Sequence, residues 1–368
     1  MRRLVALSGW GVKGPACFLL EMAGRRVLLD LGEGPEAGRR PHLGGVPKVD
    51  AILVSHGHAD HVGALDLASE VGDPPVYATA PVRALGDARL KAARDLPIGG
   101  STVIAGLEIE TGPAGHAPGA VWLRIGGPQG LLYTGDYSAE SALFPCAPPP
   151  PASALVCDAS YGDAEEPLDR QILDLVERAR RRPLLLPAPP AGRALEMALA
   201  FQRAGVPVAL CAVTRAVART LAAHPAAAVP ALRDWPAELL ETTAELTADS
   251  RPAGAMIVAG AQAERGLSAE LTQRFAASGE ADIVFTGHVA EGSAAERLLA
   301  SGQAVLRRWN VHPNRDGLRA LVAAVRPSVM LPAFLPHARM GALQTLFPEL
   351  RIVTDQPGFS CEFKLAEA

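Results

Sequence analysis

The sequence predicts an α/β protein made of two domains. The chain has 368 residues, which is more than one compact core of ordinary size holds. Short apolar segments separated by Pro and Gly dominate the first part of the chain, up to Gly162. From Glu165 onward, apolar segments alternate with segments of helical spacing, which indicates a mostly parallel sheet covered by helices on both faces.

The elements of the first part are short strands that end at polar residues. The apolar segment at residues 49–54 is followed directly by a loop rich in His. Residues 26–29, 107–111 and 131–133 are further strand-like segments that stop shortly before Asp or His. A strand that ends in a tight polar loop can aim the side chains of that loop at one point, so these strand ends are the candidate site.

The elements of the second part alternate in type. Their spacing predicts two helices, at residues 168–182 and 192–204. The predicted strands are residues 183–187, 206–210, 256–259 and 281–285.

Three imidazoles and one carboxylate fall within the six residues that follow the strand at residues 49–54. They are His56, His58, Asp60 and His61. Imidazole nitrogen and carboxylate oxygen are the donors that divalent zinc takes. Surface or capping histidines are an adequate explanation for one or two such residues, but four donors at this spacing favour a metal site.

Two later segments place a further donor where a strand stops. His116 follows the strand at residues 107–111, and Asp136 follows the apolar run at residues 131–133. Taken alone, a single His is more often structural and a Gly-Asp pair is usually a turn. Their order after the first cluster favours both as additional metal ligands.

This order of residues resembles the metallo-β-lactamase superfamily, which has an early Asp, the pattern His-x-His-x-Asp-His, a later His and a later Asp. The resemblance implies that His56, His58 and His116 hold one zinc ion, that Asp60 and His61 hold a second, and that Asp136 bridges them. Asp30 would then orient the ligand loop by hydrogen bonding. An ordinary turn before Gly32 explains Asp30 about as well.

Three later motifs are similar to those of the β-CASP branch of that superfamily, a group of RNA- and DNA-processing nucleases that includes the pre-mRNA 3′-end cleavage factor and the bacterial RNase J type. They lie at Asp158, His312 and His337. By resemblance, His312 would act as general acid, Asp158 would support it, and His337 would complete the second zinc site. The residues next to these three differ from the family pattern, but the metal donors are retained.

Two segments between those motifs also resemble the branch. Residues 187–196 look like the Gly-Arg helix start of its inserted domain, and residues 287–293 look like its Gly-Tyr-x-x-x-Gly-Thr segment. We therefore expect Arg193, His288 and Ser293 to contact substrate.

The resemblance implies a metallo-β-lactamase αββα sandwich interrupted by an inserted β-CASP-like α/β domain. The sandwich would comprise residues 1–164 and 308–368, and the insertion residues 165–307. A helix at residues 315–325 and a strand at residues 328–331 would complete the sandwich.

The favoured function is a zinc-dependent phosphodiester hydrolase that acts on RNA. Two Zn²⁺ ions would lower the pKa of a shared water so that hydroxide attacks phosphorus, with Mn²⁺ or Fe as alternative metals. The expected catalytic residues are Asp60, Asp158 and His312. Two other hypotheses stay open: a dinuclear zinc hydrolase of a small ester, thioester or lactone, and a non-catalytic scaffold.

Charge and composition bear on the partner and the cellular compartment that we expect for the enzyme. The net charge is −4 and the pI about 6.2, whereas nucleic-acid domains are usually basic. The arginines at residues 178–182 are explained better as a solvated helix end than as a nucleic-acid patch.

The five Cys show no paired spacing, so we expect them to be reduced. The expected partner is RNA or single-stranded DNA in the cytoplasm, with no membrane, and a homodimer stays open.

Overall fold

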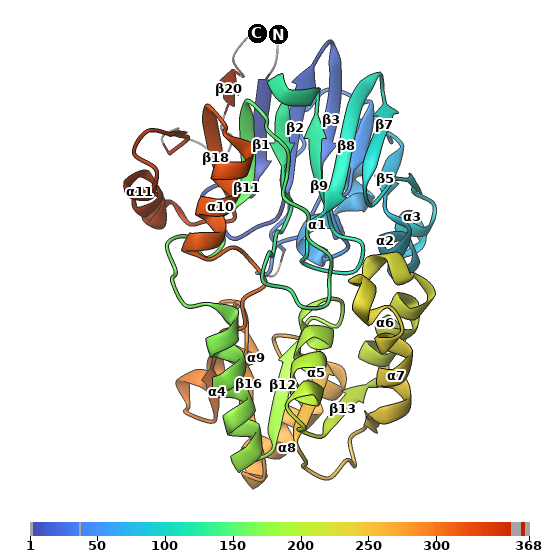
Figure 1. Ribbon diagram of the computed structural model, residues 1–368, viewed down its shortest axis with the longest axis vertical. Coiled ribbons are helices and arrows are strands. Elements are labelled where there is room, and N and C mark those ends of the chain that lie inside the picture. The colour runs from blue at the N-terminus through green and yellow to red at the C-terminus, as the bar shows by residue number, and fades with distance from the viewer. Residues whose placement is uncertain (1–2, 37, 355–361, 365–368) are drawn as a thin grey trace. The chain divides into compact units, whose positions relative to one another are not determined.

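The computed structural model describes residues 3–36, 38–354 and 362–364, and the chain forms two compact units (Figure 1). The first unit comprises residues 1–139, 144–165 and 312–368. The second comprises residues 140–143 and 166–311. The predicted insertion was residues 165–307, so the second unit extends a few residues further and also includes a short segment from the first half of the chain.

One seven-stranded sheet of the first unit contains the early strands in the order β20-β1-β2-β3-β4-β5-β6. Strands β1, β2 and β3 pair antiparallel, whereas β3, β4, β5 and β6 pair parallel. The strands are β1 (Arg3–Ser8), β2 (Cys17–Met22), β3 (Arg25–Leu29), β4 (Ala51–Leu53), β5 (Val76–Ala78), β6 (Arg94–Asp95) and β20 (Glu362–Lys364).

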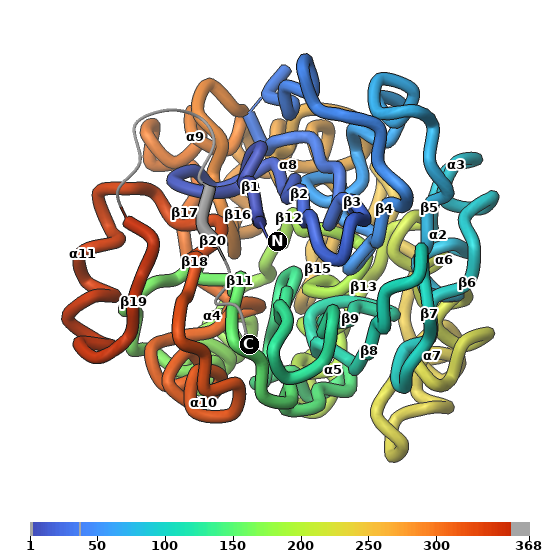
Figure 2. The backbone as a smooth tube through the Cα atoms, turned by 90° about the horizontal axis from the view of Figure 1, so that it is seen from above, coloured from blue at the N-terminus to red at the C-terminus, as the bar shows by residue number. Residues whose placement is uncertain are grey.

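The other seven-stranded sheet has the order β19-β18-β11-β10-β9-β8-β7. Strands β11 and β18 lie far apart in the sequence, yet they pair in parallel and run side by side in Figure 2. The strands are β7 (Gly100–Ile104), β8 (Leu107–Pro113), β9 (Val121–Ile125), β10 (Leu131–Tyr133), β11 (Ala154–Asp158), β18 (Val329–Ala333) and β19 (Arg351–Ile352).

Apolar side chains from both sheets form one core. Phe18 and Leu29 of the first sheet and Ile109 and Leu123 of the second belong to the same buried cluster, as the alternation of side chains along each strand requires. A second cluster packs the outer face of the first sheet against helices. The helices and turns of this unit are α1 (Ala59–Val62), η1 (Leu65–Val71), α2 (Ala80–Leu85), α3 (Ala88–Lys91), η2 (Gly127–Gln129), α10 (Arg315–Val325) and α11 (His337–Leu346).

The first unit is therefore an αββα sandwich, and the prediction of this fold is confirmed. Helices α10 and α11 add buried side chains such as Leu318 and Met340 to the core of the second sheet. The predicted helix at residues 315–325 coincides with α10.

The second unit is built on a six-stranded sheet in the order β14-β13-β15-β12-β16-β17, in which every pairing is parallel. Helices α4 and α5 lie in front of this sheet in Figure 1, and α8 packs on it through the buried Leu271 and Phe275. The predicted parallel α/β arrangement is confirmed. The strands are β12 (Leu184–Ala188), β13 (Val208–Cys211), β14 (Ala244–Leu246), β15 (Ala255–Ala259), β16 (Asp282–Phe285) and β17 (Ala304–Leu306).

The helices of the second unit connect these strands. They are α4 (Leu168–Arg181), α5 (Arg193–Arg203), α6 (Ala212–Ala223), η3 (Pro225–Ala227), η4 (Pro230–Leu232), α7 (Trp235–Thr242), α8 (Gly266–Ser278) and α9 (Ala294–Ala300). None of the helices in the described part of the chain has the length and apolar character that crossing a membrane requires.

Candidate metal centre

The polar residues at the strand ends of the first unit come together in space. Parallel strands β3 and β4 end beside Asp30 and Ser55, and β10 ends just before Asp136. Gly135 allows the close approach of the two sheets here, since its φ is +54° and a Cβ on it would lie 2.5 Å from Ser55 Cβ. A larger residue at position 135 would push Asp136 away from the loop that starts at Ser55.

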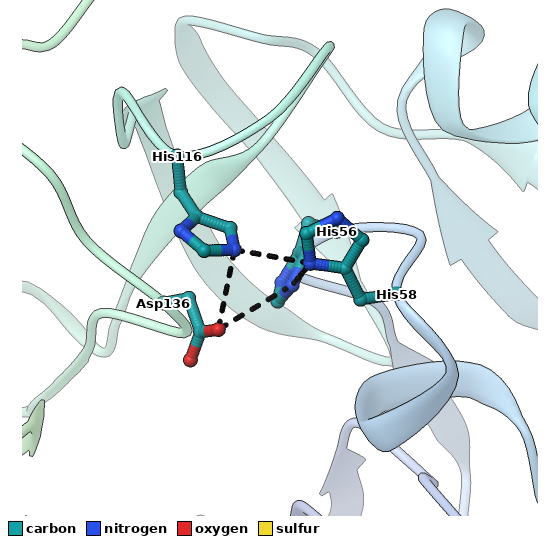
Figure 3. Close-up of side chains that lie close together, drawn as sticks. All are labelled: His56, His58, His116 and Asp136. Atoms are coloured by element: carbon teal, nitrogen blue, oxygen red, sulfur yellow. Dashed lines mark hydrogen bonds and ion pairs between the residues drawn. The ribbon is translucent and has the colours of Figure 1, made fainter. Parts of the chain in front are cut away.

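Four side chains form the first donor group: His56, His58, His116 and Asp136 (Figure 3). Nδ1 of His58 lies 3.1 Å from Nε2 of His56 and 3.0 Å from Nε2 of His116. Oδ2 of Asp136 lies 3.3 Å from Nε2 of His116 and 3.7 Å from Nε2 of His56. The ligand atoms of the group all lie within 4.8 Å of one another.

These nitrogen contacts fit a cation better than they fit hydrogen bonding alone. A ring nitrogen without hydrogen has a single lone pair, so Nδ1 of His58 cannot accept two good hydrogen bonds from His56 and His116. Three imidazole nitrogens and a carboxylate oxygen that point at one centre are the donor set of zinc and similar divalent ions. The residues of the first group can therefore hold a divalent metal ion.

A second group shares Asp136 and adds Asp60 and His61. Oδ1 of Asp136 lies 3.3 Å from Nε2 of His61, while Oδ2 faces the first group. Among the described residues, the buried Oδ1 has the ion pair with His61 but no hydrogen bond of good geometry. Because a buried carboxylate oxygen is costly to leave without a hydrogen bond, its position next to Asp60 and His61 fits a donor to a metal ion.

Asp30 contacts the second group through the ring nitrogen of His61 that faces away from Asp136. Its Oδ1 accepts a hydrogen bond from the Ser55 backbone N–H (2.7 Å). Its Oδ2 accepts from the Ser55 hydroxyl (2.7 Å) and the Tyr133 hydroxyl (2.5 Å), and it lies 2.7 Å from Nδ1 of His61. When Nδ1 of His61 carries the hydrogen, Nε2 is left free to face Asp136 and a metal.

Burial and neighbouring charges set the protonation of the donor side chains. Burial, with His61 and His58 nearby, holds the pKa of His56 well below its usual value, so its ring is neutral and can donate to a metal. Burial alone would raise the pKa of Asp136, but His61, His312 and His116 outweigh it and hold that pKa well below its ordinary value. Burial opposes protonation of His61, but Asp136 and Asp30 raise its pKa well above the usual value.

Asp158 and His312 form a pair next to the first group. Nδ1 of His312 lies 2.7 Å from Oδ2 of Asp158, and the His312 ring centroid is 5.1 Å from that of His116. Asp158 also accepts hydrogen bonds from the Tyr137 N–H (3.1 Å), the Ser160 N–H (3.0 Å) and the Ser160 hydroxyl (2.7 Å). The carboxylate is thus fixed by four contacts and in turn fixes the ring of His312.

His337 is not brought into either metal group by this structure. Its ring is exposed at the start of α11 and packs edge-on against Trp10, with the ring centroids 4.5 Å apart. The side chain from this segment that contacts His61 is Phe334, whose ring centroid is 5.2 Å from that of His61. The expectation that His337 completes the second zinc site is thus at odds with its position here.

The expected substrate contacts all lie in the second unit. Arg193 begins α5, and its Nη1 occupies the space where a Cβ on Gly287 would be, 1.9 Å away. His288 follows this glycine and its carbonyl accepts a hydrogen bond from Gln262 (2.8 Å). Ser293 is buried, and its hydroxyl caps α9 by accepting the Glu296 N–H (3.1 Å). A helix cap accounts for Ser293 without a substrate.

The sequence did not single out the residues that support the acidic side chains. Ser55 and Tyr133 bind Asp30, while Tyr137 and Ser160 bind Asp158. Ser55 directly precedes the His cluster, and Ser160 lies two residues after Asp158, so their proximity in sequence was a usable signal. Tyr133 reaches Asp30 from the other sheet, which no local pattern reveals.

Residues 10–189 match the model of the metallo-β-lactamase superfamily. The chain thus carries a metallo-β-lactamase domain, and the family recognised from the sequence motifs is confirmed.

Three relatives extend this result. The chain is 30% identical over 252 residues to the transcription termination factor FttA of Methanothermobacter thermautotrophicus, covering 54% of the chain and 39% of FttA. It is 35% identical over 181 residues to ribonuclease TTHA0252 of Thermus thermophilus, covering 41% and 42%. Identity to Integrator complex subunit 11 of Gallus gallus is 28% over 242 residues, covering 51% and 40%. The aligned part of the chain thus spans less than half the length of each.

A solved structure resembles the fold over almost the whole chain. It is the crystal structure of a protein of unknown function from Enterococcus faecalis V583, with a TM-score of 0.62 and 14% identity. The alignment covers 98% of this chain and 100% of that one. The fold of this chain therefore recurs in a protein of very different sequence.

Proposed function

We propose that the protein is a metal-dependent hydrolase of phosphodiester bonds and that RNA is its substrate. The observation that carries the proposal is the junction of two metal-donor groups, which share Asp136, with a hydrogen-bonded Asp158–His312 pair. Such a pair beside a metal centre suits a reaction that needs an acid for the leaving group. Ribonuclease TTHA0252 among the relatives favours RNA over a small ester as the substrate.

The donor groups would hold two divalent ions, and we propose zinc. Three imidazoles and a carboxylate in the first group match zinc, although Mn²⁺ or Fe also accept mixed nitrogen and oxygen donors. When bound, the ions would supply Lewis acidity toward a phosphate oxygen and lower the pKa of a water.

The chain itself would supply positioning and proton transfer. Asp158 holds Nδ1 of His312, so Nε2 is the atom that would give a proton to the leaving ribose oxygen. Asp60 is half-buried at the start of α1 and would accept a hydrogen bond from the attacking water. Asp30 keeps His61 in one orientation while these steps occur.

The nuclease proposal is tested by offering the zinc-loaded protein labelled single-stranded RNA, single-stranded DNA and p-nitrophenyl acetate. We expect cleavage of RNA. Hydrolysis of the ester alone would reject the nuclease and favour the small-molecule hydrolase.

A His312→Ala variant tests the proposed acid. This variant should keep its metal content and lose RNA cleavage by roughly 10²- to 10⁴-fold, the usual contribution of acid catalysis. His42→Ala, which removes an exposed imidazole elsewhere in the first unit, is the matched control. A His312→Ala rate equal to that of the control would remove His312 from the mechanism.

Contacts of Arg193 and His288 with RNA, a homodimer and a place in the cytoplasm remain predictions. Arg193 is the stronger candidate of the two residues, because a guanidinium at a helix start suits a phosphate. Light scattering on the purified protein would test the dimer.

A further inference from the structure

The two donor groups differ in the number of ligands that the chain offers. The first has four donors, His56, His58, His116 and Asp136, which is the number of ligands that a structural zinc ion takes. The second has Asp60, His61 and Asp136, and the last of these is shared. Among the described residues, the second group has no fourth His, Cys, Asp or Glu.

His337 is kept where it is by contacts that do not involve a metal. The residues before it pair with the loop at Trp10 and Gly11: Trp10 bridges to Ala333 and Gly11 to Pro336. The His337 N–H donates to the Gly11 carbonyl at 3.3 Å. The ring then lies over Gly11, where a Cβ would meet Nε2 at 2.0 Å, and packs on Trp10.

The side of the second group that faces this segment is apolar. Phe334 is almost completely buried and packs edge-on against the His61 ring, and its own ring also contacts Phe18. The backbone pairing of Phe334 with Gly9 (2.7 Å) fixes this arrangement. A hydrophobic ring thus approaches His61 from the segment that carries His337.

We infer that the two metal sites are unequal. The first site binds an ion tightly with four chain ligands, and the second binds one more weakly with three, while His337 takes no part in either. This inference deepens the proposed function, on which it rests for the presence of metal at these groups. Catalytic zinc sites have three protein ligands, so Asp60, His61 and Asp136 would hold the ion that supplies Lewis acidity toward the substrate.

Zinc titration of the metal-free protein tests the inference without any measurement of cleavage. Competition with a chromogenic chelator and elemental analysis after dialysis would give the affinity and number of bound ions. We expect two steps, the second weaker by at least about tenfold, which corresponds to about 1.4 kcal/mol. His337→Ala should leave both steps within about twofold of wild type, as should the control His42→Ala.

Variants of single metal ligands assign each zinc-binding step to one of the two donor groups. Asp60→Ala should remove the weak step and keep the tight one, whereas His116→Ala should weaken the tight step. Circular dichroism and thermal unfolding of each variant would identify any variant that fails to fold, and for those Asp60→Asn and His116→Gln take their place.

Loss of one zinc ion in His337→Ala, or two steps of equal affinity in wild type, would overturn the inference. Binding of no zinc at all would overturn both it and the metal part of the proposed function. Two unequal steps together with no cleavage of RNA would reject the proposed function alone.

Discussion

Asp158 in the first unit and Glu196 in the second are both buried acids, but their surroundings differ sharply. Asp158 receives four hydrogen-bond contacts, two at each oxygen. Oε1 of Glu196 has no partner among the described residues, and Oε2 has a long contact of 3.4 Å from Trp309 Nε1. Burial raises the pKa of Glu196 to about 7, although hydrogen bonds with Ser141 and Trp309 and the charge of Arg193 act in the opposite direction. For Glu196, burial thus favours the protonated form more strongly than the surrounding donors favour the charged form.

Because of these differences, Asp158 is suited to a role in a catalytic site and Glu196 is not. A carboxylate fixed at both oxygens has one geometry, and it transmits that geometry to His312. Glu196 lies on α5 and lines an apolar cavity of about 300 Å³ together with Leu143, Ile172 and Leu199. Because its pKa is about 7, the charge of Glu196 changes with the pH of the solution near neutrality.

Replacing Asp158 by Asn should have the largest effect. The amide offers one acceptor oxygen where the carboxylate has two, so either the Ser160 contacts or the contacts with Tyr137 and His312 are lost. We expect RNA cleavage to fall by about 10²- to 10⁴-fold with unchanged zinc content, measured in single-turnover assays.

The double variant Asp158→Asn/His312→Ala tests whether Asp158 acts by positioning His312. If Asp158 acts through His312, the double variant should be little worse than His312→Ala alone. Effects that add fully would contradict the pairing. A diester with a p-nitrophenyl leaving group should be hydrolysed almost as well by the variants, because that group needs no acid.

Replacing Glu196 by Gln should change the pH dependence of stability. In the unfolded chain this carboxyl ionises near its ordinary value of 4.5, but in the folded chain it stays protonated up to about pH 7. Between these values only the unfolded state loses the proton, so the free energy of unfolding falls as pH rises and levels off above pH 7. The full effect is at most about 3 kcal/mol, at 1.36 kcal/mol per pKa unit.

Chemical unfolding at pH 4 and pH 8 measures this effect. Glu196→Gln should lose less stability than wild type between the two pH values. Glu270→Gln removes an exposed carboxylate of α8 and should change little. Identical pH profiles for wild type and Glu196→Gln would show that Glu196 is ionised or paired in the folded protein.

The sequence revealed those parts of the site that one loop or one ordered set of motifs contains. His56, His58, Asp60 and His61 are neighbours in sequence, so the spacing alone predicted that they converge. The alternation of strands and helices after Glu165 likewise revealed the parallel sheet, because each βα unit is local.

Contacts between segments that are distant in sequence could not be predicted in this way. The contact of Tyr133 with Asp30 depends on how the two sheets pack, and the position of His337 depends on the pairing of its segment with Gly9 and Gly11. The resemblance implied a role for His337 from its place in the order of motifs, whereas the backbone pairing with Gly11 and the contact with Trp10 determine where its ring lies. The residues 140–143 of the second unit carry no pattern that would separate them from the first.

Asp30 extends the comparison with Glu196, because it is a buried acid with hydrogen bonds at both oxygens. Asp30→Asn should weaken zinc binding by roughly 10- to 100-fold, the usual cost of losing a residue that orients a metal ligand. The amide nitrogen would face a donor, either Ser55 or Tyr133, and His61 would lose its fixed orientation. The loss should fall mainly on the weaker zinc site, since His61 belongs to that group. If zinc titration of Asp30→Asn showed that only the tight step is weakened, Asp30 would instead support the first donor group, which contains His56.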